Sequence, residues 1–99
     1  MAQFDVHRLG SGEGLVLDCQ SDLLQQLNTR FVVPLIPQED APAPAQRLNP
    51  TFVIDGRRFV MVTQFAAAAH CNELGEAIAS LRGHSFEVVG ALDVLISGV

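Results

Sequence analysis

The chain contains no lysine, and its six basic residues are all arginine. Eleven acidic residues outweigh them and leave a net charge of −5. Because affinity for nucleic acid comes largely from Lys and Arg side chains that neutralise phosphates, direct binding to DNA is not expected. No stretch approaches the roughly 20 apolar residues of a membrane span, and no apolar signal-peptide segment follows Met1. The chain is therefore expected to be cytoplasmic, with its thiols reduced.

Side chains that hold metals or form covalent intermediates are also scarce. Structural zinc sites usually take their ligands from spaced pairs such as CxxC or HxxxH, and Cys71 stands directly beside His70 without such spacing. Adjacent residues on a strand point to opposite faces, which does not suit a nucleophile and its base. We expect no metal, no cofactor and no catalytic residue, and we expect Cys19 and Cys71 to be buried free thiols. The side chains considered were His7, His70, His84, Cys19 and Cys71.

Length and hydropathy point to one small domain with apolar surface to spare. The chain has 99 residues, 48% of them hydrophobic, and we expect residues 1–99 to form a single domain. A domain of this size has only a small core. Surplus apolar surface often ends in a subunit interface. We therefore expect a symmetric homodimer.

Five short apolar or alternating segments predict strands, at residues 3–7, 15–19, 31–36, 51–54 and 59–63. Asp55-Gly56 predicts a tight hairpin between the last two. Pro34 indicates an edge position or a bulge for the third segment. The four acidic residues near strand ends or turns are expected to be solvated caps, namely Asp5, Asp18, Asp22 and Asp55.

Residues 85–96 carry the clearest helical pattern, with Ser85 as a plausible N-cap. Val88, Leu92 and Leu95 follow helical spacing, and we expect Leu95 in the core. Residues 66–69 are four alanines, for which propensity alone predicts a second helix. The expected fold is mostly β, with an antiparallel sheet closed by a C-terminal helix.

Two stretches and the C-terminus carry a distinctive residue pattern. Residues 17–24 read Leu-Asp-Cys-Gln-Ser-Asp-Leu-Leu, residues 27–35 continue Leu-Asn-Thr-Arg-Phe-Val-Val-Pro-Leu, and the chain ends Ile-Ser-Gly-Val at residues 96–99. The pattern resembles that of the CcdB family of bacterial gyrase-directed toxins, which typically shows a hydrophobic residue before Asp-Val-Gln-Ser-Asp, then Arg, then an apolar-Pro-Leu close. The resemblance covers nearly the whole length.

The resemblance implies a CcdB/MazF-type SH3-like barrel and a two-fold dimer. It implies a toxin that binds the DNA gyrase A subunit and traps the cleaved gyrase–DNA complex. It also implies a CcdA-like antitoxin that competes for the same surface. In such a fold residues 66–74 are extended, and we prefer this to the helix because sheet packing commonly overrides propensity.

The gyrase-binding surface implied by the family maps onto an apolar pair after Gln-Ser-Asp and onto the terminal helix. At position 97 the family's prototype places a Trp that stacks on an Arg of gyrase, whereas this chain has Ser97. Stacking of this kind contributes about 1–2 kcal/mol when desolvated. For Ile96 and Val99 a core role and a binding role both stay open. The mapped residues are Leu23, Leu24, Asp93, Ile96, Ser97, Gly98 and Val99.

Two alternative functions remain on the same fold. A MazF-type ribonuclease needs a basic RNA groove with Arg beside Thr or Ser, and Thr29-Arg30 has the residue types. The acidic composition argues against it. A degenerate homologue that binds antitoxin without poisoning gyrase is favoured by Ser97.

Overall fold

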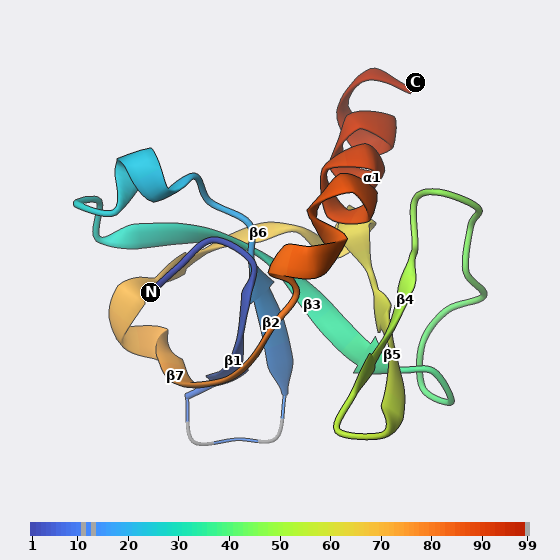
Figure 1. Ribbon diagram of the computed structural model, residues 1–99, viewed down its shortest axis with the longest axis horizontal. Coiled ribbons are helices and arrows are strands. Elements are labelled where there is room, and N and C mark those ends of the chain that lie inside the picture. The colour runs from blue at the N-terminus through green and yellow to red at the C-terminus, as the bar shows by residue number, and fades with distance from the viewer. Residues whose placement is uncertain (11, 13, 99) are drawn as a thin grey trace.

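The computed structural model describes residues 1–10, 12 and 14–98. Within these residues, seven strands form one antiparallel sheet that curls into a half-barrel, with a C-terminal helix on one side (Figure 1). The mostly-β fold class with a closing helix is confirmed. The strands are β1 (Asp5–Leu9), β2 (Leu15–Asp18), β3 (Thr29–Pro37), β4 (Thr51–Ile54), β5 (Arg57–Met61), β6 (Ala67–His70) and β7 (Leu74–Ser80). The helix is α1 (Ser85–Ser97), and the short 3-10 helices are η1 (Asp22–Leu24), η2 (Thr63–Phe65), η3 (Cys71–Glu73) and η4 (Arg82–His84).

The sheet runs in the order β4-β5-β3-β2-β1-β7, and β6 pairs with β3. Successive side chains on a strand point to opposite faces. Leu17 and Val33 therefore join the main core beneath α1, together with Val88 of the helix. Their neighbours Val16 and Val32 join a second, smaller cluster with Ala69 and Leu74, on the face that β6 and β7 enclose. Both faces of the central strands are buried, which explains the continuous apolar run of β3.

Pro34 does not mark an edge strand. β3 is central: β2 lies along one side, while the other side pairs with β6 over residues 29–32 and with β5 over residues 35–37. The Pro34 carbonyl accepts a hydrogen bond from the Val62 N–H on that second side, at 3.0 Å. A strand residue directs its N and O to the same side, so the missing N–H of Pro34 falls at the gap between two partner strands. The prediction of an edge position is wrong because Pro34 lies in a central strand, at the point where the partner on one side changes from β6 to β5.

The alanine run is a strand, as the resemblance implied and propensity did not. Ala67–His70 forms β6 and pairs with residues 29–32 of β3. Ala69 packs into the smaller cluster. Residues 66–74 are extended except at η3. β7, which the residue patterns did not predict, pairs with β1 and completes the curl.

The C-terminal helix begins at Ser85 and ends at Ser97. Ser85 is not the N-cap: η4 leads directly into the helix, His84 occupies the capping position, and no side chain caps there. Val88 and Ala91 are buried, but Leu95 is 41% exposed and therefore not in the core as expected. The first two turns of α1 cover the sheet, and its last turns project beyond it (Figure 1). None of the helices in the described part of the chain has the length and hydropathy of a membrane-spanning segment.

Candidate partner-binding surface

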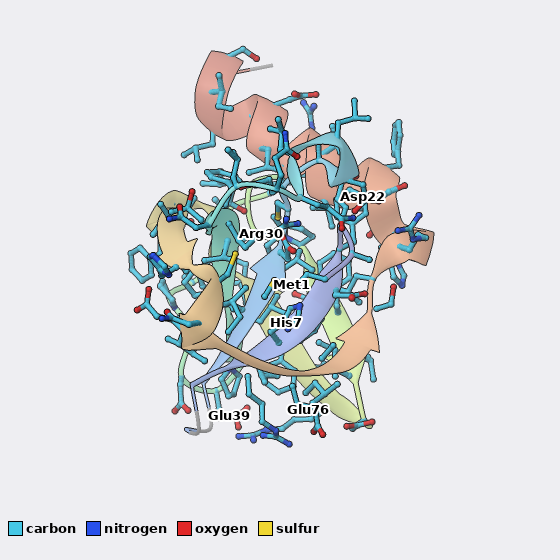
Figure 2. The ribbon with its side chains drawn as sticks, turned by 90° about the vertical axis from the view of Figure 1, so that its left-hand side faces the viewer. Met1, His7, Asp22, Arg30, Glu39 and Glu76 are labelled. Atoms are coloured by element: carbon cyan, nitrogen blue, oxygen red, sulfur yellow. The ribbon has the colours of Figure 1, made fainter. Side chains whose placement is uncertain are left out.

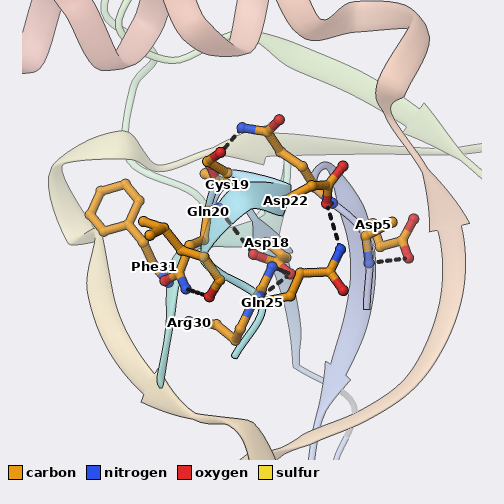
Figure 3. A network of polar contacts seen from close by, with 12 residues as sticks. Asp5, Asp18, Cys19, Gln20, Asp22, Gln25, Arg30 and Phe31 are labelled. Carbon is orange, nitrogen blue, oxygen red and sulfur yellow. Dashed lines mark hydrogen bonds and ion pairs between the residues drawn. The ribbon is translucent and has the colours of Figure 1, made fainter. Parts of the chain in front are cut away.

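The connection between β2 and β3 is held in one conformation by the polar residues of the Asp-Cys-Gln-Ser-Asp stretch (Figure 3). Gln20 bridges its two ends. Its Nε2 donates to the carbonyls of Leu24 at 3.1 Å and Thr29 at 3.0 Å, and its Oε1 accepts the Phe31 N–H at 2.9 Å. Ser21 caps η1, because its Oγ accepts the Leu23 N–H at 3.1 Å.

Asp22 ties the same connection to the N-terminus. Its Oδ1 accepts the Gln3 N–H at 2.8 Å and the Gln25 Nε2 at 3.1 Å. Its Oδ2 lies 3.5 Å from Arg82 Nη2. The backbone hydrogen bond from Gln3 is the main reason that the pKa of Asp22 is lowered, with Gln25 and Arg82 adding to it. The Asp22 side chain is thus exposed to solvent, yet its carboxylate contacts three other residues.

These contacts present leucines to solvent on a fixed support. Leu23 is 86% exposed and Leu24 is half-exposed, as the mapping from the family requires. Leu27 is as exposed as Leu24, and the sequence analysis did not include it in the candidate surface. An apolar residue in a polar loop could have indicated it. Large apolar side chains gathered on the surface commonly mark an interaction site.

The second part of the mapped surface is the end of α1. Asp93, Ile96, Ser97 and Gly98 are exposed, and Ile96 reaches 78%, so its core role is excluded within the isolated chain. Ser97 Oγ donates to the Asp93 carbonyl at 2.8 Å. Gly98 ends the helix in the left-handed conformation, with its N–H on the Val94 carbonyl at 2.9 Å. Val99 lies outside the described residues.

The two parts do not merge into one patch within a chain. η1 and the end of α1 lie at the same end of the molecule, separated across the view in Figure 1. A single protomer therefore offers two separate exposed apolar elements.

Beneath η1 lies a charged contact that sequence reasoning missed. Asp18 and Arg30 are 0% and 1% exposed, which corrects the solvated cap proposed for Asp18. Arg30 Nε donates to Asp18 Oδ2 at 3.0 Å. Nη2 lies 2.8 Å from the same oxygen without the alignment of a hydrogen bond. The sequence signal is that Asp18 stands within an apolar strand segment and that Arg30 directly precedes one.

His7 is also buried, with Nδ1 3.0 Å from the Gly75 carbonyl and no hydrogen-bond partner at Nε2. Figure 2 shows His7 and Arg30 inside the ring that β6 and β7 complete. No group of three His, Cys, Asp or Glu side chains among the described residues is placed to hold a metal ion. The interior of the half-barrel is thus polar in part, and these polar side chains lie away from solvent.

The two cysteines differ in environment. Cys19 is buried, and its burial and the nearby Asp18 carboxylate raise its pKa to about 12. Cys71 is only partly buried, so the expectation for it was wrong; its Sγ lies 3.5 Å from the Leu27 carbonyl. Cys71 begins η3 at the edge of the sheet and not within a strand, which leaves it accessible.

Comparison with known families gives one match, and it covers nearly the whole chain. The family model described as CcdB protein matches residues 3–98. No individually curated protein matches the chain. The matched range includes η1 and α1, and therefore both parts of the exposed surface.

Proposed function

Because the chain belongs to the CcdB family, toxins of toxin–antitoxin systems, we propose that it binds the DNA gyrase A subunit and traps the cleaved gyrase–DNA complex. It acts in this proposal by binding a protein and not as an enzyme. The observation that carries the proposal is the pair of exposed apolar elements at one end of the molecule, Leu23 with Leu24 on η1 and Ile96 on α1.

The proposed active form is a two-fold homodimer located in the cytoplasm. Two-fold symmetry would duplicate the η1 and α1 elements and match the symmetry of a gyrase A dimer. The gyrase-binding residues would be Leu23, Leu24, Asp93, Ile96, Ser97, Gly98 and Val99. A CcdA-like antitoxin would bind the toxin and compete for this surface.

Ser97 sets the expected strength of gyrase binding. Its hydroxyl is already engaged with the Asp93 carbonyl, so it offers neither an aromatic ring nor a free donor. We expect weaker binding than a Trp at this position would give, since an aromatic anchor often contributes about 2 kcal/mol or more.

A binding titration of the purified protein against the gyrase A N-terminal domain tests the proposal. Ser97→Trp should bind more tightly, and deletion of residues 97–99 should abolish binding while thermal stability and antitoxin binding persist. Undiminished gyrase binding by the deletion variant would contradict the site. Absence of gyrase binding by both the natural chain and Ser97→Trp would replace the proposal with the antitoxin-binding homologue.

One contact speaks against the ribonuclease alternative. Arg30, its candidate RNA-binding residue, is closed to solvent and paired with Asp18. A buried guanidinium engaged with a carboxylate is not available to a phosphate. An RNA-cleavage assay with the purified protein should therefore give no product.

A further inference from the structure

The carboxamide of Gln20 takes the place of a backbone peptide group where the ladder between β2 and β3 ends (Figure 3). In a regular antiparallel ladder, a hydrogen-bonded pair of facing residues exchanges two N–H···O bonds. The register places Cys19 opposite Phe31, and the Cys19 N–H donates to the Phe31 carbonyl at 2.9 Å. The Phe31 N–H, however, donates to Gln20 Oε1 at 2.9 Å. Gln20 therefore extends the ladder beyond its last regular pair.

The nitrogen of the same carboxamide closes the loop between β2 and β3. Nε2 carries two protons, and it donates to the Leu24 carbonyl at 3.1 Å and to the Thr29 carbonyl at 3.0 Å. Leu24 is the last residue of η1, and Thr29 is the first residue of β3. The Gln20 side chain thus joins η1 directly to the sheet, with its oxygen and both of its protons engaged.

The position of η1 depends on contacts of this kind because the helix is short. It contains three residues, none of them buried, and a helix of this length is not stable by itself in water. Two backbone hydrogen bonds lie within the loop, from the Leu24 N–H to the Ser21 carbonyl at 3.0 Å and from the Leu27 N–H to the Leu24 carbonyl at 3.3 Å. Both are local, and neither reaches a strand.

We propose that Gln20 is a positioning residue for gyrase binding, an inference that rests on the proposed function. Gln20 acts through Leu23 and Leu24, which η1 presents to solvent. A loop that is ordered before association loses less conformational entropy on binding than a mobile loop, and it therefore binds more tightly. The affinity for gyrase should accordingly depend on a side chain that holds η1 from beneath.

A pair of matched variants measures this dependence. Gln20→Met keeps the length of the side chain and removes its hydrogen bonds. Gln26→Met is the control in the same loop, because the exposed Gln26 side chain makes no hydrogen bond to another of the described residues. Both are made in the Ser97→Trp chain and titrated calorimetrically against the gyrase A N-terminal domain. Gln20→Met should bind at least about tenfold more weakly than its parent, and Gln26→Met should bind within about twofold of it.

A double-mutant cycle separates positioning from a general loss of stability. When Leu23 is replaced by Ala, part of what Gln20 positions is gone. Gln20→Met should then weaken gyrase binding by only about threefold. A general destabilisation would weaken binding by the same factor with and without Leu23. An equal loss in both backgrounds, or no loss in either, would overturn the inference while gyrase binding by Ser97→Trp persists.

Amide hydrogen exchange tests the contact in the natural chain, whether or not Gln20→Met folds well. The Phe31 N–H, whose acceptor is Gln20 Oε1, should exchange as slowly as the amides within β3. Exchange at the rate of an unprotected amide would overturn the inference, and gyrase is absent from this measurement. If Ser97→Trp does not bind gyrase, the proposed function fails and the inference fails with it. If Ser97→Trp binds gyrase and Gln20→Met binds equally well, the inference alone fails.

Discussion

At the scale of single residues, the Asp18–Arg30 pair lies closed to solvent beneath η1. Burying two charges costs several kcal/mol of desolvation for each, and their attraction offsets this only while both are present. The pair also adjoins Gln20, whose N–H donates to Asp18 Oδ1 at 3.1 Å. Through Gln20, the buried Asp18–Arg30 pair is therefore linked to the loop between β2 and β3, which carries Leu23 and Leu24.

Arg30→Met should lower the free energy of unfolding by about 3–5 kcal/mol, because it leaves the Asp18 carboxylate buried without a counter-charge. Asp18→Leu combined with Arg30→Met should be more stable than either single variant. The matched control is Glu39→Gln, which breaks the exposed Glu39–Arg57 pair and should cost less than about 1 kcal/mol. Urea denaturation measures all four. A cost for Arg30→Met no larger than the control's would refute the buried pair.

The two thiols should react at very different rates in the native protein. With a pKa of about 12, Cys19 is in its reactive thiolate form in only about one molecule in ten thousand at pH 8. Cys71 is partly exposed. Iodoacetamide followed by mass spectrometry should show one modified site, Cys71, in the native chain and both sites in guanidinium. Rapid native modification of Cys19 would show that its surroundings are open.

At the scale of elements, the seam between β1 and β7 closes the half-barrel and depends on one close approach. The Gly10 N–H donates to the Glu73 carbonyl at 2.6 Å, and the β1–β7 register shifts twice along the seam. A Cβ at Gly75 would lie 2.5 Å from the Gly10 carbonyl oxygen and 3.2 Å from that of Arg8. Both are backbone atoms, which cannot rotate away.

Gly75→Ala should therefore force β7 away from β1 and destabilise the fold by about 1–3 kcal/mol, the usual range for overpacking. Amide hydrogen exchange should accelerate along β7 before other strands. Gly83→Ala is the control, since a Cβ there meets nothing within 4 Å, and it should be nearly neutral. Equal stability of the two variants would mean that the seam is looser than described.

Elements with local signals were predictable, and elements formed by long-range pairing were not. The β4–β5 hairpin at Asp55-Gly56 and the terminal helix follow from turn chemistry and helical spacing. β6 contains three alanines, which favour a helix. It forms a strand because residues 29–32 of β3 have a free side to which it pairs. The position of Asp18 at a strand end predicts a solvated cap, but β6 and β7 enclose this residue in the folded chain. In both cases the deciding partner lies far away in the chain.

At the scale of the whole molecule, exposed apolar side chains favour self-association. Leu95 is 41% exposed on the projecting end of α1, and Phe65 of η2 is half-exposed. We predict that light scattering at micromolar concentration gives twice the 10.7 kDa mass of the chain. Leu95→Asp should shift the mass toward the monomer, whereas Leu9→Asp, at a similar 44% exposure on β1, should not. A monomer for the natural chain would contradict the proposed assembly.

The candidate surface was predictable only in part. Exposure of Leu23, Leu24 and Ile96 agrees with a binding role carried over from the family. A pocket that Phe86 and Gly90 of α1 form with Pro50 was not foreseen, because it needs the loop before β4 to lie alongside α1. Helical spacing reports which residues share a face, and it does not report what another segment leaves uncovered.

The central claim, poisoning of gyrase, is tested most directly by incubating the purified protein with gyrase, ATP and supercoiled plasmid, then measuring linear DNA after detergent and protease treatment. We predict linear DNA that increases with the amount of protein, more of it with Ser97→Trp, and none with the chain lacking residues 97–99. A plasmid that stays supercoiled, with no linear DNA at any concentration of the natural chain or of Ser97→Trp, would contradict the claim.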